Sequence, residues 1–150
     1  MYLSPQSQIP LTWPILLAPL LVAAVLIFLI SLFREPGRQK FSAVFLAGAG
    51  AAYLSGGLGL AEFAFCALIT FLAYRGLDNY RYIAIGWVLH TCWDFAHHYH
   101  GNPIIIFDPT SSIGCAICDL GLAAYYAIGA PTIIRNAAIQ KRIYGVHRTN

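Results

Sequence analysis

Histidine and acidic residues in the segment 90–98 carry the clearest chemical signal in this sequence. At about 100° per residue, His90, Asp94, His97 and His98 share one face of a helix within an arc of about 100°. A rise of 1.5 Å per residue separates His90 from His97 by about 10 Å along the axis. Because metal–nitrogen bonds are about 2 Å long, one ion is not expected to bind both. The pairs open to one ion are Asp94 with His97 or His98, and His90 with Asp94.

Other segments supply partners of the same chemical types. Glu62 and Asp119 are acids in apolar stretches, and Cys115 and Cys118 form a C-x-x-C pair beside Asp119. A mixed set of imidazole, carboxylate and thiolate favours a transition metal ion, Zn²⁺, Fe or Cu, over Mg²⁺ or Ca²⁺. The candidate metal ligands are therefore His90, Asp94, His97, His98, Cys115 and Cys118.

Two further interpretations of these residues stay open. Without a metal, a carboxyl and an imidazole can act as acid and base, and the candidate catalytic residues are Glu62, Asp94, His98 and Asp119. The polar stripe can also be a structural hydrogen-bond network between helices. The two cysteines can equally form a structural or redox-sensitive pair on an oxidising side of a membrane.

The elements that must position these residues are helices in lipid. The chain has 150 residues, of which 59% are hydrophobic and 10% charged. A soluble domain of this length carries roughly 25% charged residues, whereas lipid allows apolar side chains to face outward. No basic, aromatic-rich stripe indicates a nucleic-acid partner. We expect one transmembrane domain over residues 1–150, with the lipid bilayer and a hydrophobic small molecule as partners. The pattern does not indicate an oligomeric state.

Breaks in the apolar pattern predict an all-α, polytopic bundle. A 20-residue apolar helix is about 30 Å long, which matches the hydrocarbon core of a bilayer. The uncharged run from 41 to 77 is too long for one span, and the sequence Ser-Gly-Gly-Leu-Gly at 55–59 marks the point where it turns back. The predicted spans are 13–33, 41–55, 59–75, 80–99 and 113–130. A basic, apolar segment at 133–144 is expected to lie on the membrane surface.

The basic residues sort to one side of this topology. With five spans, all nine Lys and Arg residues fall on one side: Arg34, Arg38, Lys40, Arg75, Arg81, Arg135, Lys141, Arg142 and Arg148. The positive-inside rule makes that side cytoplasmic, which places the N-terminus outside and the C-terminus inside. The expected location is a membrane crossed several times, the cell inner membrane if the source is bacterial. The cluster then lies toward the outer face.

The one-sided cluster leads to a functional hypothesis. Ionisable groups at membrane depth cost free energy and usually serve function. We expect an integral membrane protein that acts as a membrane-embedded enzyme on a hydrophobic or lipid-like substrate, either metal-dependent or by acid/base chemistry. The alternatives are a non-enzymatic protein that binds or transports a metal or protons, and a structural subunit of a membrane complex.

One segment also carries a family resemblance. The motif comprises His97 to Ile104 (HHYHGNPI), Pro109 to Ser112 (PTSS) and Gly114 to Asp119 (GCAICD). It resembles a family of small bacterial and fungal membrane proteins known only as a domain of unknown function. The resemblance covers most of the chain from the second predicted span onward. It implies a polytopic membrane protein and brings no activity or substrate with it.

Overall fold

Helices make up the regular structure of this protein. The computed structural model describes residues 10, 12–105 and 107–133. Within that part of the chain there are five α-helices, one short 3₁₀-helix and no strand. They are α1 (Trp13–Ser31), α2 (Gly37–Ala51), η2 (Ala52–Ser55), α3 (Leu60–Gly76), α4 (Tyr80–His100) and α5 (Ser111–Ala127). The predicted all-α class is therefore confirmed for the described residues.

The helix boundaries differ most from the prediction in α2 and α5. We placed the start of the second helix at residue 41, after the charges, but α2 begins at Gly37, directly after Pro36. Basic side chains are good helix formers, so they do not end a helix. The fifth helix was expected over 113–130, but it stops at Ala127 because Gly129 and Ala130 adopt positive φ angles of 85° and 50°. Left-handed residues at this point terminate a helix.

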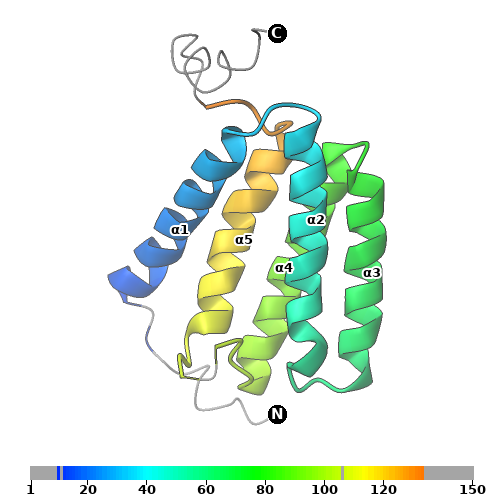
Figure 1. Ribbon diagram of the computed structural model, residues 1–150. Coiled ribbons are helices and arrows are strands. Elements are labelled where there is room, and N and C mark those ends of the chain that lie inside the picture. The colour runs from blue at the N-terminus through cyan, green and yellow to red at the C-terminus, as the bar shows by residue number, and fades with distance from the viewer. Residues whose placement is uncertain (1–9, 11, 106, 134–150) are drawn as a thin grey trace, which may run out of the picture.

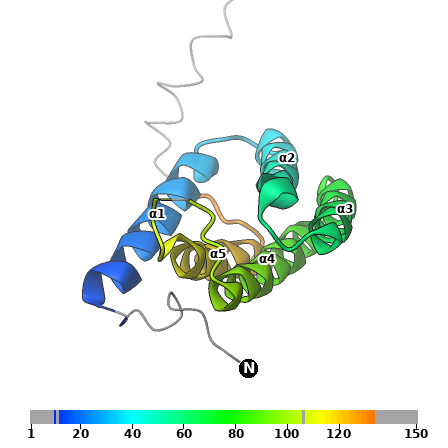
Figure 2. The ribbon, with the colours of Figure 1, turned by 90° about the horizontal axis from the view of Figure 1, so that it is seen from below.

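The helices stand side by side, with α4 between α3 and α5 (Figure 1). α2 packs on α3 and α4, and α1 packs chiefly on α5. Seen along the bundle, α1 is tilted relative to the other helices (Figure 2). α1 touches α5 closely at Gly121, where an added Cβ would lie 3.1 Å from the Cβ of Ala23. α4 is thus the helix through which α3 and α5 are brought together.

The two ends of the bundle differ in charge. The described Lys and Arg residues lie at the end formed by the α1–α2 and α3–α4 connections, which we call the basic end: Arg34, Arg38, Lys40, Arg75 and Arg81. At this end Arg38 pairs with Glu35 at 2.9 Å and donates to the carbonyl of Ala130 at 3.0 Å. The predicted segregation holds for these residues. Arg135, Lys141, Arg142, Arg148 and the predicted surface segment 133–144 lie outside the described residues, apart from residue 133.

One described helix, α1, is long and apolar enough to cross a membrane. It has 19 residues. An 18-residue stretch of it has a mean hydropathy of 2.7, and 17% of that stretch is buried inside the structure. A helix near the N-terminus with these properties is also what a signal sequence contains. Large apolar side chains are exposed on other helices as well, for example Phe63 (60% exposed) and Phe71 (56%) on α3.

Two glycines of α2 provide a test of the packing. A Cβ on Gly50 would lie 2.9 Å from the Cβ of buried Ile69, whereas a Cβ on Gly48 meets nothing within 4 Å. Alanine favours a helix over glycine by about 1 kcal/mol at either site. We expect Gly48→Ala to keep or raise the stability, and Gly50→Ala to lower the free energy of unfolding by about 1–3 kcal/mol. Unfolding of both variants in the same detergent measures the difference, and equal stabilities would contradict this packing.

Candidate metal and acid/base centre

Three ionisable side chains converge between α4 and α5. His90 and Asp94 lie one turn apart on α4, and Asp119 faces them from α5. One ligand atom of each residue lies within 4.8 Å of the others, and His90 Nδ1 is 3.2 Å from Asp119 Oδ2. All three are buried, and Asp94 has no exposed surface. We call these three residues the centre.

Close contact between α4 and α5 holds the centre together. Asn79 caps the N-terminus of α4, where its side chain accepts a hydrogen bond from the backbone N–H of Arg81 at 2.9 Å. The helix ends at His100 and is capped by Gly101, whose φ of 73° is in the left-handed region that glycine adopts freely. Between these points, Thr91 donates to the carbonyl of Trp87 at 3.0 Å and lies 3.5 Å from that of Ala116 on α5. The small side chain of Ala116 lets the helices approach, so Asp119 reaches His90.

Tyr53 belongs to the centre although the sequence did not single it out. It lies in η2, and its hydroxyl donates a hydrogen bond to Asp94 Oδ1. Its ring centroid is 5.0 Å from that of His90. The residue is 3% exposed. From the sequence, a tyrosine near the end of a predicted span is expected at the membrane–water interface. The only available signal was its position two residues before the Ser-Gly-Gly turn, where the chain re-enters the bundle.

Asp94 and His90 both have buried polar atoms without a hydrogen-bond partner among the described residues. The Oδ2 atom of Asp94 is buried and accepts no hydrogen bond from any described residue. No described Lys or Arg forms an ion pair with Asp94 or Asp119. Two carboxylates in a dry core repel each other and lose hydration, so a proton or a cation must offset their charge. A cation bound by these three residues, or a proton shared between the two carboxyl groups, would therefore give Asp94 Oδ2 a partner.

Glu62 forms a second, separate buried group with His97. Glu62 Oε1 is 3.1 Å from His97 Nε2 and accepts from the backbone N–H of Leu58 at 3.1 Å. Its Oε2 accepts from Trp93 Nε1 at 3.0 Å. Gly56 makes this arrangement fit, because an added Cβ would lie 2.6 Å from His97 Cε1 and 2.8 Å from Glu62 Oε1. This group joins α3, α4 and the turn between η2 and α3.

The structure divides the residues predicted from the sequence. His90, Asp94 and Asp119 come together, whereas Glu62 and His97 pair with each other. The expectation that His90 and His97 do not share an ion agrees with this division. His98 is half-buried and lies in neither group, with its ring centroid 6.3 Å from that of Tyr99.

The two cysteines of the C-x-x-C pair are outside the centre. Cys115 is half-buried, Cys118 is buried, and both are free thiols. They are not part of the three-residue group that could hold an ion. Instead, both line a groove of about 470 Å³ between α1 and α5. The structure therefore places them beside the centre, on the side that faces α1.

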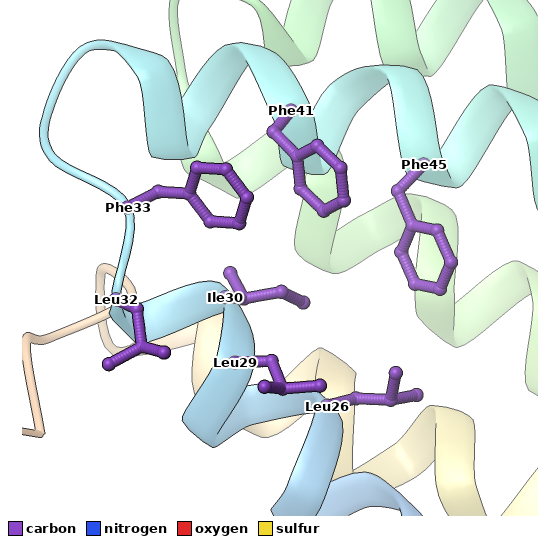
Figure 3. A pocket seen from close by; sticks show the side chains of 7 residues that line it. All are labelled: Leu26, Leu29, Ile30, Leu32, Phe33, Phe41 and Phe45. Carbon is purple, nitrogen blue, oxygen red and sulfur yellow. The ribbon is translucent and has the colours of Figure 1, made fainter.

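A second cavity of about 490 Å³ lies between α1 and α2, toward the basic end. Figure 3 shows Leu26, Leu29 and Ile30 facing Phe33, Phe41 and Phe45. Every side chain that lines it is a hydrocarbon, so it offers no acid, base or metal ligand. Among the described residues, this cavity therefore contributes nothing to the chemistry of the centre.

Comparison with known proteins identifies the class of this chain and no more. Residues 15–132 match a family model described as a family of unknown function, DUF6010. The chain therefore belongs to this family, as the resemblance of its motif indicated. No curated protein and no solved structure matches it.

The Glu62 group predicts a strong stability effect. Glu62→Ala removes the carboxylate that accepts from the half-buried indole of Trp93 and backbone N–H of Leu58 and that pairs with buried His97. Because an unsatisfied buried donor costs about 1–3 kcal/mol, we expect the free energy of unfolding to fall by at least about 2 kcal/mol. Asp78→Ala removes an exposed carboxylate and is the matched control. Similar unfolding midpoints for the two variants would show that the Glu62 contacts contribute little.

Proposed function

We propose that this chain is a multi-pass membrane protein whose core centre binds a transition metal ion and acts on a lipid-like substrate. Three observations support the membrane part. α1 has the length and hydropathy of a span. Leu21 on α1 and Phe63 on α3 are 66% and 60% exposed, and apolar surface of this kind suits lipid better than water. The described basic residues gather at one end, which is consistent with a cytoplasmic side.

The convergence of His90, Asp94 and Asp119 carries the proposal of a metal centre. An imidazole nitrogen and two carboxylate groups from two helices face one point, and Asp94 Oδ2 lacks a partner there. Bonds of about 2 Å put two ligands of one ion at most about 4 Å apart. The His90–Asp119 separation of 3.2 Å already meets this limit. The outer limit of 4.8 Å requires the side chains to close by less than about 1 Å.

The donor set narrows the choice of metal. With both thiols outside the group, the protein ligands are one nitrogen and carboxylate oxygens. This set suits Zn²⁺, Fe²⁺ or Mn²⁺, and it removes the soft ligands that favour Cu⁺. Three protein ligands leave room for water or substrate, as in catalytic rather than structural sites. Tyr53 holds Asp94 by a hydrogen bond, a role that outer-shell partners play in metal sites.

The reaction best matched to this arrangement is a hydrolysis. A bound divalent ion activates water and polarises a carbonyl or phosphoryl oxygen. The residues of the chain would orient the ion, exclude bulk water and take up the proton that water loses. Burial within a bundle confines the chemistry to substrates that reach it from the membrane. This accounts for a lipid-like rather than a polar substrate.

A metal-free form of the same enzyme is favoured by one observation. Asp94 and Asp119 are close enough for a single proton to offset one of the two charges, with His90 as the neighbouring base.

A pore through the bundle is less well supported than an enzyme. Ile83 and Trp87 on α4 and Leu122 on α5 lie between the centre and the basic end, are buried, and are apolar apart from one indole N–H. Uptake into proteoliposomes separates a transporter from an enzyme.

Metal content is the direct test of the centre. We expect the full chain, purified in detergent without chelator, to carry a stoichiometric transition metal ion. His90→Ala, Asp94→Ala and Asp119→Ala should each lose it, because each removes one of three ligands. Tyr53→Phe keeps the ring but releases Asp94, and should weaken metal affinity by about 10–100-fold. Elemental analysis and competition with a chelator measure both effects.

Two controls keep this test specific. His98→Ala and the double variant Cys115→Ser, Cys118→Ser alter potential ligands outside the centre, so the metal should remain. If the wild-type chain takes up no transition metal, or if His98→Ala loses it as Asp94→Ala does, the metal form of the proposal is wrong. Retained folding, followed by circular dichroism, shows that a loss of metal is not a loss of structure.

Membrane topology is tested separately. We expect a reporter active only outside the cytoplasm to function when fused after Pro109, in the α4–α5 connection. The same reporter fused after Asp78, in the α3–α4 turn, should be inactive, because the basic end stays in the cytoplasm. A cytoplasmic reporter should give the reverse pattern. The same compartment for both fusions would contradict the multi-pass arrangement.

A further inference from the structure

The groove between α1 and α5 has the form of a site for one hydrocarbon chain. Its volume is about 470 Å³, and Ile15, Ala18 and Val22 of α1 line one side. Gly114 lies opposite, where an added Cβ would be 3.5 Å from Pro19 Cγ. A larger side chain at this position would therefore enter the groove. α1 is tilted against its neighbours (Figure 1). The groove follows the half of α1 that begins the helix, because its α1 lining residues lie between Pro14 and Val22.

The rim of this groove is polar and carries one charge. Asp108, Thr110 and Ser111 line it where the α4–α5 connection joins α5. Asp108 Oδ1 accepts from the backbone N–H and the hydroxyl of Thr110 at 2.9 and 2.8 Å, which fixes the carboxyl group. The carboxyl group is half-buried, and the described Lys and Arg residues are all at the basic end, away from it. The rim is thus complementary to a positive charge.

A backbone group adds to the negative character of the groove. Proline has no N–H, so Pro19 cannot donate to the carbonyl of Ile15, one turn earlier in α1. Both residues line the groove. A carbonyl without its helical donor favours a cation or a donor group nearby.

The groove also lies next to the centre. Cys115 is one helical turn from Asp119, and Cys118 is its neighbour in the chain. Both cysteines line the groove, while Asp119 points to His90. The groove and the centre are therefore both bordered by residues of α5.

We propose that this groove binds a cationic lipid, with one hydrocarbon chain along α1 and an amine headgroup at Asp108. That this lipid is the substrate of the centre rests on the proposed function. The binding itself does not, because it depends on groove residues and not on the metal ligands. The chemical class of ligand is a long-chain amphiphile with a positively charged nitrogen.

The thiols in the groove provide the measurement. In a Cys66→Ser, Cys92→Ser background, Cys115 and Cys118 are the remaining cysteines, and N-ethylmaleimide reports their access. The protein is placed in vesicles with equal fractions of hexadecyltrimethylammonium, hexadecanol or hexadecyl sulfate, which share one chain length. We expect labelling to be about two- to fivefold slower with the cation than with the alcohol, the range typical of one partly exposed ion pair. The sulfate should protect least.

Two variants make this test specific. Asp108→Asn keeps the oxygen that accepts from Thr110 and removes only the charge, so it should abolish the difference between cation and alcohol. A variant with only Cys92, an exposed thiol on α4, shows how each amphiphile alters labelling in general. Gly114→Leu fills the groove and should remove protection by all three.

The outcomes separate the proposals. Equal labelling rates with all three amphiphiles, or a cation preference that survives Asp108→Asn, would overturn the lipid assignment. Metal content is measured on the same preparations. Bound metal without cation-dependent protection would leave the metal centre standing and remove the lipid proposal. Protection without metal would do the reverse.

Discussion

Burial of carboxyl groups without a Lys or Arg partner among the described residues is the constraint on which this structure depends. Asp94 and Glu62 have almost no exposed surface, and no described Lys or Arg forms an ion pair with either. In an apolar core such groups require hydrogen-bond donors, a proton or a cation. Their surroundings follow from that requirement: a tyrosine from η2, and an indole and two histidines from α4.

The two buried acids meet this requirement in different ways. Glu62 has partners for both oxygens, drawn from α4 and the turn before α3, so its role in holding the fold is complete without a ligand. Asp94 has Tyr53 on one oxygen and no partner on the other. Because an unmade bond in the core is costly, a residue that keeps one open is better explained by chemistry than by stability. This difference is why we place function at Asp94 and not at Glu62.

The sequence was sufficient to predict the helices and the gathering of the described basic residues at one end, but not the grouping of the site residues. Turn residues and uncharged runs located the five α-helices, although the ends of α2 and α5 shifted by up to four residues. Periodicity shows that His90 and Asp94 share a face, yet it does not give the depth or rotation of a neighbouring helix. Glu62 was therefore grouped with Asp94, although α3 is offset so that it meets His97. Tyr53 was missed because its hydroxyl enters the core from a short 3₁₀-helix.

α1 borders two cavities of different character. α1 meets α5 closely where Gly121 faces Ala23, and a cavity lies on either side: a hydrocarbon one with α2 and a polar-rimmed one with α5. Only the second borders the helix that carries Asp119. α1 thus forms one wall of the groove beside the centre, while α4 and α5 carry the three residues of the centre.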